Sequence, residues 1–154
     1  YTCRYLDAGL TTDQKAALMA EYQCLPAFDD VEESLVGLKA AGHSLYAFSN
    51  GAADAVEKLL AAAGSRDLFD GVVSTDDRHT FKPNPDVYEH LLKTTAASAN
   101  DAWLISSNPF DVIGAVSYGL RSAWVQRSKN SIFDPWGIDP TLTITSLGEL
   151  GRWL

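Results

Sequence analysis

Polar residues that could do chemistry follow three apolar runs of the chain. They are Ser49 and Asn50, then Ser74 to Asp77, and then Ser106 to Asp111. A lysine, Lys82, stands in the segment FKPNPDVY after the second run. A lysine can hold a neighbouring carboxylate ionised, and serine and asparagine can donate hydrogen bonds to an anionic substrate or orient a water molecule. The residue types therefore suit the binding of a small anion.

Each of these residues also has a simpler explanation when it is taken alone. Ser49 and Asn50 could cap the helix that follows them, because hydroxyl and amide groups satisfy the free N–H groups of a first turn. Lys82 could be an ordinary solvated lysine, and Asp111 could complement a helix dipole. The clustering favours a shared site over these three separate explanations.

The elements that must position these residues alternate between helices and strands. Amphipathic helical patterns cover residues 11–23, 30–41, 52–63, 84–96 and 109–119. Short apolar strands are predicted at 43–48, 69–75, 101–106, 121–127 and 142–145, with a short helix at 147–154. This rhythm predicts an α/β fold with a doubly wound parallel sheet. The carboxyl ends of parallel strands gather loops and helix N-termini at one edge, which is where the polar residues fall.

Composition excludes several classes of partner. The formal net charge is −8, so nucleic acid and anionic membrane surfaces would be repelled. No apolar run approaches the roughly 20 residues of a membrane span, and the first residues have no export-signal pattern. We expect a cytoplasmic protein. The strand ends contain no cysteine nucleophile, no glycine-flanked serine elbow and no nearby histidine.

The ordered segments LKAAGHSLYAFSNG, FDGVVSTD, FKPNPDVYEHLL, WLISSNPFDVIGA and SAWVQRSKN resemble the haloacid dehalogenase superfamily. Within it they are most similar to the (S)-2-haloacid dehalogenases. Phosphatases of the superfamily carry two acids in the fourth motif that serve magnesium, whereas this chain has SSNPFD with the single acid Asp111. Loss of an acid removes charge that a hard divalent cation needs. The resemblance therefore implies no metal and no cofactor.

The resemblance implies hydrolysis of (S)-2-haloalkanoic acids through an aspartyl ester, with inversion at C2. It assigns a role to each of eight residues. The catalytic residues would be Lys82, which holds the nucleophile ionised, Asn108 and Asp111, which position water, and Ser106, which belongs to the same carboxylate network. The substrate-binding residues would be Ser49, Asn50, Tyr88 and Phe110.

The family's nucleophile motif, an aspartate at the end of an N-terminal strand, has no match in these 154 residues. Asp70 in LFDG precedes its strand and does not qualify. We expect residues 1–25 to be the C-terminal remnant of a helical cap and residues 26–154 to be an α/β core that lacks its nucleophile strand. That strand would lie between those ending in Ser49 and Ser106, and its loss would leave unpaired backbone groups. The chain alone is predicted to be inactive.

Two other functions stay open at this stage. The chain could belong to a phosphatase of the same superfamily, or it could be a non-catalytic interaction module that exposes a pairing edge. The dehalogenase hypothesis predicts a small 2-haloacid as the binding partner. The resemblance is also compatible with a homodimer, in which a second chain could supply the absent strand.

Overall fold

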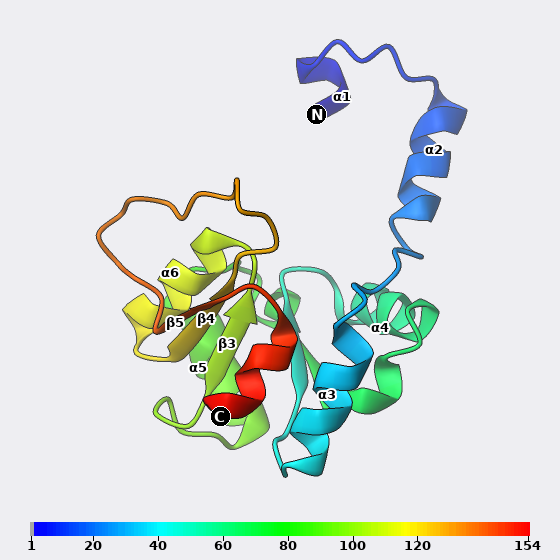
Figure 1. The fold of residues 1–154 in the computed structure, drawn as a ribbon. Helices are drawn as coiled ribbons and strands as arrows, with labels where there is room; N and C mark the ends of the chain where they lie inside the picture. The colour runs from blue at the N-terminus through cyan, green and yellow to red at the C-terminus, as the bar shows by residue number, and fades with distance from the viewer. Residues whose placement is uncertain (1) are drawn as a thin grey trace.

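The computed structural model describes residues 2–154, in which helices alternate with parallel strands (Figure 1). The elements in chain order are α1 (Thr2–Tyr5), α2 (Thr12–Glu21), α3 (Val31–Ala40), β1 (Tyr46–Ser49), α4 (Ala53–Ala62), η1 (Arg66–Leu68), β2 (Gly71–Ser74), η2 (Thr75–Arg78), α5 (Pro85–Thr95), β3 (Trp103–Ser106), α6 (Pro109–Tyr118), β4 (Arg121–Val125), β5 (Leu142–Ile144) and η3 (Leu147–Arg152). The α/β fold class predicted from the sequence is confirmed.

The strands form two parallel sheets. In the first sheet β1 pairs with β2, and Ser49 lies opposite Ser74 at their carboxyl ends. In the second sheet the order is β3–β4–β5, and Ser106 lies opposite Trp124. This register brings the polar residues that follow β1, β2 and β3 to the same edge of the fold, as the sequence predicts.

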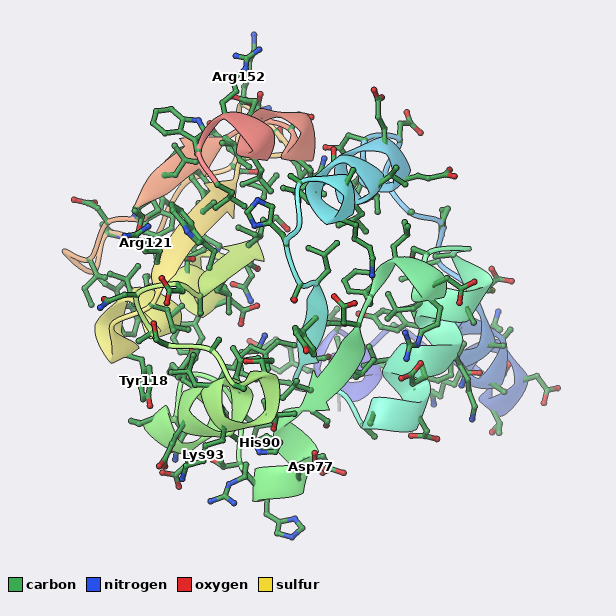
Figure 2. All side chains as sticks on the ribbon, turned by 90° about the horizontal axis from the view of Figure 1, so that it is seen from below. Asp77, His90, Lys93, Tyr118, Arg121 and Arg152 are labelled. Carbon is green, nitrogen blue, oxygen red and sulfur yellow. The ribbon has the colours of Figure 1, made fainter. Side chains whose placement is uncertain are left out.

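A cavity of about 370 Å³ lies between one edge of the first sheet and one edge of the second. β1 and β3 are the strands that border it, and among the described residues neither strand pairs with a partner on that side. Figure 2 shows the sheets on opposite sides of this space. Most of the lining is apolar, from Leu35 and Phe48 to Ile105, but Lys82 and Asp111 also line it. We refer to this space as the intersheet cavity.

Helices cover both faces of the second sheet, and each face has its own core. α3 and η3 lie against one face, where Leu38, Val125 and Ile144 are buried together. α5 and α6 lie on the other, where Val87, Leu104 and Ala115 form a second buried cluster. These residues recur at the spacing of one helix face or on alternate sides of a strand, so burial follows the periodicity of the sequence.

A single carboxylate ties the start of α3 to the end of the chain. Asp30 accepts hydrogen bonds from Arg127 Nη1 at 2.7 Å, from Ser146 Oγ at 3.1 Å and from the backbone N–H of Leu147 at 2.7 Å. Burial acts to raise the pKa of Asp30, but the three donors outweigh it and the pKa lies below its ordinary value. We call this group the Asp30 anchor.

The N-terminal helices stand apart from the α/β part (Figure 1). α2 begins at a capping box, in which Thr11 and Gln14 exchange side-chain and backbone hydrogen bonds. None of its residues is buried, and Met19 is 62% exposed. The sequence correctly predicts this helix, but its apolar residues cover no described part of the core.

Two further expectations differ in detail. The first predicted strand, residues 43–48, is shorter and later, because His43 still bonds to the end of α3 and β1 starts at Tyr46. The predicted C-terminal helix is a 3-10 helix, which begins at Leu147 directly after its N-cap residue, Ser146. No helix among residues 2–154 has the length and apolarity to cross a bilayer.

Candidate active site

Lys82 is buried beside the carboxyl end of β1, which rules out the explanation that it is a solvated loop lysine. Its side chain is 7% exposed. Nζ donates to the carbonyl of Phe48 at 3.3 Å and to Asp111 Oδ2 at 3.1 Å, and it lies 5.0 Å from the centre of the Phe48 ring. The loop after η2 thus delivers an ammonium group to the polar end of the intersheet cavity.

Asp111 and Ser106 complete a hydrogen-bonded group with this lysine. Asp111 lies in the first turn of α6, and its Oδ2 accepts from Ser106 Oγ at 3.2 Å as well as from Lys82. The Ser106 hydroxyl in turn accepts from the backbone N–H of Asn108 at 3.0 Å. All three side chains that form this Lys82–Asp111–Ser106 group line the intersheet cavity. Helix-dipole complementation alone does not account for Asp111.

Ser49 and Asn50 form a tight turn that does not cap the next helix. α4 starts from Ala52, which makes no side-chain cap bond. Ser49 Oγ accepts from the N–H of Gly51 at 3.0 Å, and Asn50 Oδ1 accepts from the backbone N–H of Lys82 at 3.0 Å. The capping explanation is therefore wrong here, and the turn is instead fastened to the loop that carries the lysine.

Asn108 and Phe110 have partners that the sequence only partly predicts. Asn108 is the N-cap of α6, because its Oδ1 accepts from the N–H of Phe110 at 3.0 Å. Phe110 is 37% exposed, and its ring meets Trp136 edge-on with 5.9 Å between centroids. A role of Asn108 in water positioning stays a prediction, for which its amide nitrogen is the available group.

Tyr88 is completely buried in α5, packed between Phe48 and Tyr118. Among the described residues its hydroxyl has no hydrogen-bond partner. Burial, and then the negative charge of Asp111, raise the pKa of Tyr88 above its ordinary value. The phenol therefore stays protonated and holds one unused donor near the carboxylate. Its predicted role in orienting Lys82 or substrate is not tested by any contact.

Some residues around the site were not singled out by the sequence analysis. Gly114 of α6 leaves room for Tyr88 and Pro83, because a Cβ there would overlap the Tyr88 hydroxyl and come within 2.6 Å of Pro83 Cβ. Trp136 lies in the long loop before β5. Thr75 belongs to the polar residues grouped after the second strand, but no role of its own was predicted for it, and it is buried. A glycine in an apolar helix gives no signal of this kind, because its neighbours come from distant segments.

The donor types at this site suit the binding of an organic anion. Within residues 2–154 no cluster of three or more histidine, cysteine, aspartate or glutamate side chains is placed to hold a metal ion. The groups that converge are instead an ammonium, hydroxyls, amides and one carboxylate.

Comparison with known proteins identifies the family. The family model described as haloacid dehalogenase-like hydrolase matches residues 11–125. The chain belongs to this family. It is 33% identical over 147 residues to an (S)-2-haloacid dehalogenase of Pseudomonas sp. (strain YL), an alignment that covers 96% of this chain and 63% of the relative. The (S)-2-haloacid dehalogenase H-109 of Pseudomonas putida is also 33% identical, over all of this chain and 68% of its own length.

Solved structures of haloacid dehalogenases share the fold of this chain. A crystal structure of an L-2-haloacid dehalogenase superposes with a TM-score of 0.92 at 29% identity, and the match covers 99% of this chain and 67% of that one. The L-2-haloacid dehalogenase of Xanthobacter autotrophicus with chloropropionic acid covalently bound gives a TM-score of 0.85 at 28% identity, with coverage of 97% and 71%. This haloacid dehalogenase-like chain thus spans about two thirds of the length of the relatives it matches.

Proposed function

We propose that the protein containing this chain hydrolyses (S)-2-haloalkanoic acids to (R)-2-hydroxy acids. The observation that carries the proposal is the Lys82–Asp111–Ser106 group, which lines the intersheet cavity at the ends of the strands. A buried ammonium there suits a reaction that begins with a carboxylate nucleophile and an anionic substrate. The relatives named as (S)-2-haloacid dehalogenases supply the substrate class.

The nucleophile is an aspartate that this chain does not supply. We place it at the carboxyl end of an additional parallel strand between β1 and β3, contributed by a segment N-terminal to Tyr1 or by another chain. Two observations support this position. The facing edges of β1 and β3 have no strand partner among the described residues, and Lys82 Nζ, beside the cavity, donates to the β1 carbonyl of Phe48. A strand in this position would satisfy backbone groups that are costly to leave unpaired.

The reaction then proceeds in two displacements. The aspartate carboxylate attacks C2 of the haloacid, the carbon–halogen bond breaks, and the halide leaves with the bonding electrons. Water next attacks the ester carbonyl of the aspartate and releases the 2-hydroxy acid, which regenerates the carboxylate. Only the first step breaks a bond at C2, so the configuration there is inverted once.

The described residues divide the work between them. Lys82 keeps the attacking carboxylate ionised, and Asp111 and Ser106 hold Lys82 in place. Ser49 and Asn50 bind the anionic groups of the substrate, Asn108 and Asp111 position the water, and Phe110 lines the apolar side of the site. Tyr88 supplies a buried donor beside Asp111.

We further propose that the chain divides into part of a cap and an α/β core. Residues 1–25 are proposed to be the C-terminal part of a helical cap, which accords with the absence of buried residues in α2. Residues 26–154 are proposed to be the α/β core. A cytoplasmic location and a homodimer are further predictions, and the exposed apolar residues Leu18 and Met19 would suit burial against a cap or a second subunit.

Halide release tests the proposal directly. The complete protein, including the sequence upstream of Tyr1, should release chloride from (S)-2-chloropropionate and not from the R enantiomer, and the product should be (R)-lactate. The purified 154-residue chain should release halide no faster than buffer does. Lys82→Met in the complete protein should abolish release, whereas Lys93→Met, which removes an exposed lysine of α5, serves as the control.

The outcome that would overturn the proposal is equally specific. Magnesium-dependent hydrolysis of p-nitrophenyl phosphate, without halide release from either enantiomer, would make the protein a phosphatase of the same superfamily. Concentration-dependent self-association without turnover of either substrate would favour an interaction module. Halide release by the isolated chain would refute the need for an added aspartate.

A further inference from the structure

The carboxamide of Asn50 is held by two donors from separate parts of the chain. Its Oδ1 accepts from the backbone N–H of Lys82 at 3.0 Å and from the hydroxyl of Thr75 at 3.3 Å. Thr75 is completely buried at the start of η2. Because Ser49 lies opposite Ser74 in the parallel pair, the next residues along each strand, Asn50 and Thr75, emerge side by side.

These two bonds fix which way the amide faces. A backbone N–H can only donate, so the atom that meets Lys82 N must be the amide oxygen of Asn50. The Thr75 hydroxyl then donates to the same oxygen. The Nδ2 group consequently points away from both, and within residues 2–154 no group accepts a hydrogen bond from it. Asn50 itself is exposed, so two N–H donors are presented at the carboxyl end of β1.

The end of β2 holds this turn at a second point. Ser74 Oγ donates to the carbonyl of Gly51 at 2.8 Å and accepts from the N–H of Asp76 at 3.1 Å. Asn50 and Gly51 are therefore held by two consecutive buried residues, Thr75 at the start of η2 and Ser74 at the end of β2. Threonine is suited to this task because its branched Cβ restricts rotation about χ1, so its hydroxyl keeps one direction.

We propose that Thr75 is a positioning residue, whose hydroxyl holds the Asn50 carboxamide so that its NH2 group donates to an anion of the haloacid reaction. The inference rests on the proposed function for the identity of the anion, which is the departing halide or the substrate carboxylate. Asn50 is the group that touches the anion, and Thr75 acts only through it. The donor direction is set before substrate arrives, which is what makes such a contact effective.

Two substitutions separate this role from simple core packing. Thr75→Val keeps the shape of the side chain and removes the hydroxyl, whereas Thr75→Ser keeps the hydroxyl and removes a methyl group. A packing role predicts that serine is the more harmful change. A positioning role predicts the reverse, so rescue by serine is the signature. Thr143→Val is the control, because it makes the same side-chain change at an exposed threonine in strand β5.

In the complete protein, Thr75→Val should lower kcat for (S)-2-chloropropionate about tenfold if the amide stabilises the leaving halide, and should raise KM about tenfold if it binds the substrate carboxylate. Thr75→Ser should recover most of the loss in either case. Equal activity of the valine variant and the unmodified protein would overturn the proposal. A serine variant more impaired than the valine variant would overturn it as well.

A binding measurement on the complete protein keeps this test independent of turnover. In the 15N-labelled complete protein, bromide or propionate should shift the side-chain NH2 signals of Asn50, and Thr75→Val should weaken that binding at least fivefold. A response to bromide alone identifies the halide, and a response to propionate alone identifies the carboxylate. If neither anion shifts the signals, the donor role is refuted even where dehalogenation is found. If the complete protein releases no halide but the signals respond as expected, the proposed function falls and the positioning role stands.

Discussion

The buried pair of Lys82 and Asp111 should behave as one unit when either charge is removed. We expect Lys82→Met and Asp111→Asn each to lower the free energy of unfolding by about 3 kcal/mol, because each leaves an uncompensated charge or polar group in a confined place. The double variant should lose only about 4 kcal/mol, well short of the sum. The coupling energy between the two positions is then about 2 kcal/mol.

The geometry sets this magnitude. At the observed separation of 3.1 Å, two unit charges attract by about 5 kcal/mol at an effective dielectric constant near 20 and by about 1 kcal/mol in water. Side-chain exposures of 7% for Lys82 and 18% for Asp111 place the pair nearer the first limit. Desolvation of both groups then removes part of the attraction, which leaves a coupling between the two limits.

Urea unfolding of the 154-residue chain, followed by circular dichroism at several salt concentrations, measures the four free energies of this cycle. The control is the Glu89–Lys93 pair of α5, which is closer at 2.6 Å but has side chains 52% and 72% exposed. Its coupling should lie within the error of the measurement and should vanish in salt. Equal coupling in the two pairs, or a Lys82–Asp111 coupling abolished by salt, would show that burial does not govern the interaction.

Three further perturbations follow from contacts elsewhere in the fold. Gly114→Ala should destabilise the chain by about 1–3 kcal/mol in urea unfolding, because the added methyl group overlaps the Tyr88 hydroxyl. The control is Gly37→Ala in α3, where the added methyl group meets no atom within 4 Å and should stabilise the chain by up to about 1 kcal/mol. Equal effects of the two substitutions would contradict this prediction. The lowered pKa of Asp30 means that the stability it contributes is complete above the ordinary aspartate pKa and is lost as the pH falls through the lower folded-state value. Unfolding midpoints of Asp30→Asn should therefore depend less on pH than those of the unmodified chain as the pH falls below the ordinary aspartate pKa, and parallel curves would refute the assignment. Deletion of residues 1–22 should leave the thermal midpoint unchanged within error, since α2 buries none of its residues, and a clear drop would reveal contacts that matter.

The local sequence pattern predicts most of the helices and strands, and it also predicts where the polar residues gather. The predicted strand ends are apolar runs that stop at serine and asparagine, so the sequence alone groups Ser49, Asn50 and Ser106. Lys82 could be placed beside them, because its spacing from the second run put it on the same edge. The parallel pairing followed from the alternation of helices and strands.

Other features depend on contacts between distant segments and leave no local signal. Thr75 ends the predicted strand 69–75, and threonine is a common residue in strands. Nothing nearby in the sequence therefore indicates that its hydroxyl reaches Asn50, 25 residues earlier. Whether Ser49 and Asn50 cap α4 or form a separate turn depends on the position of Lys82 N–H, which a local motif does not contain. Division of the strands into two sheets is likewise decided by which strands meet in space.

The Asp30 anchor also constrains the order in which the chain can fold. Its hydrogen bonds join Asp30 to residues 97, 116 and 117 positions further along. A nascent chain leaves the ribosome N-terminus first, so α3 is available long before Arg127 and η3 are made. During that interval the Asp30 carboxylate remains hydrated and the buried face of α3 lacks part of its cover. Completion of this contact must therefore wait until Arg127, Ser146 and Leu147 have been synthesised, 97 to 117 positions after Asp30.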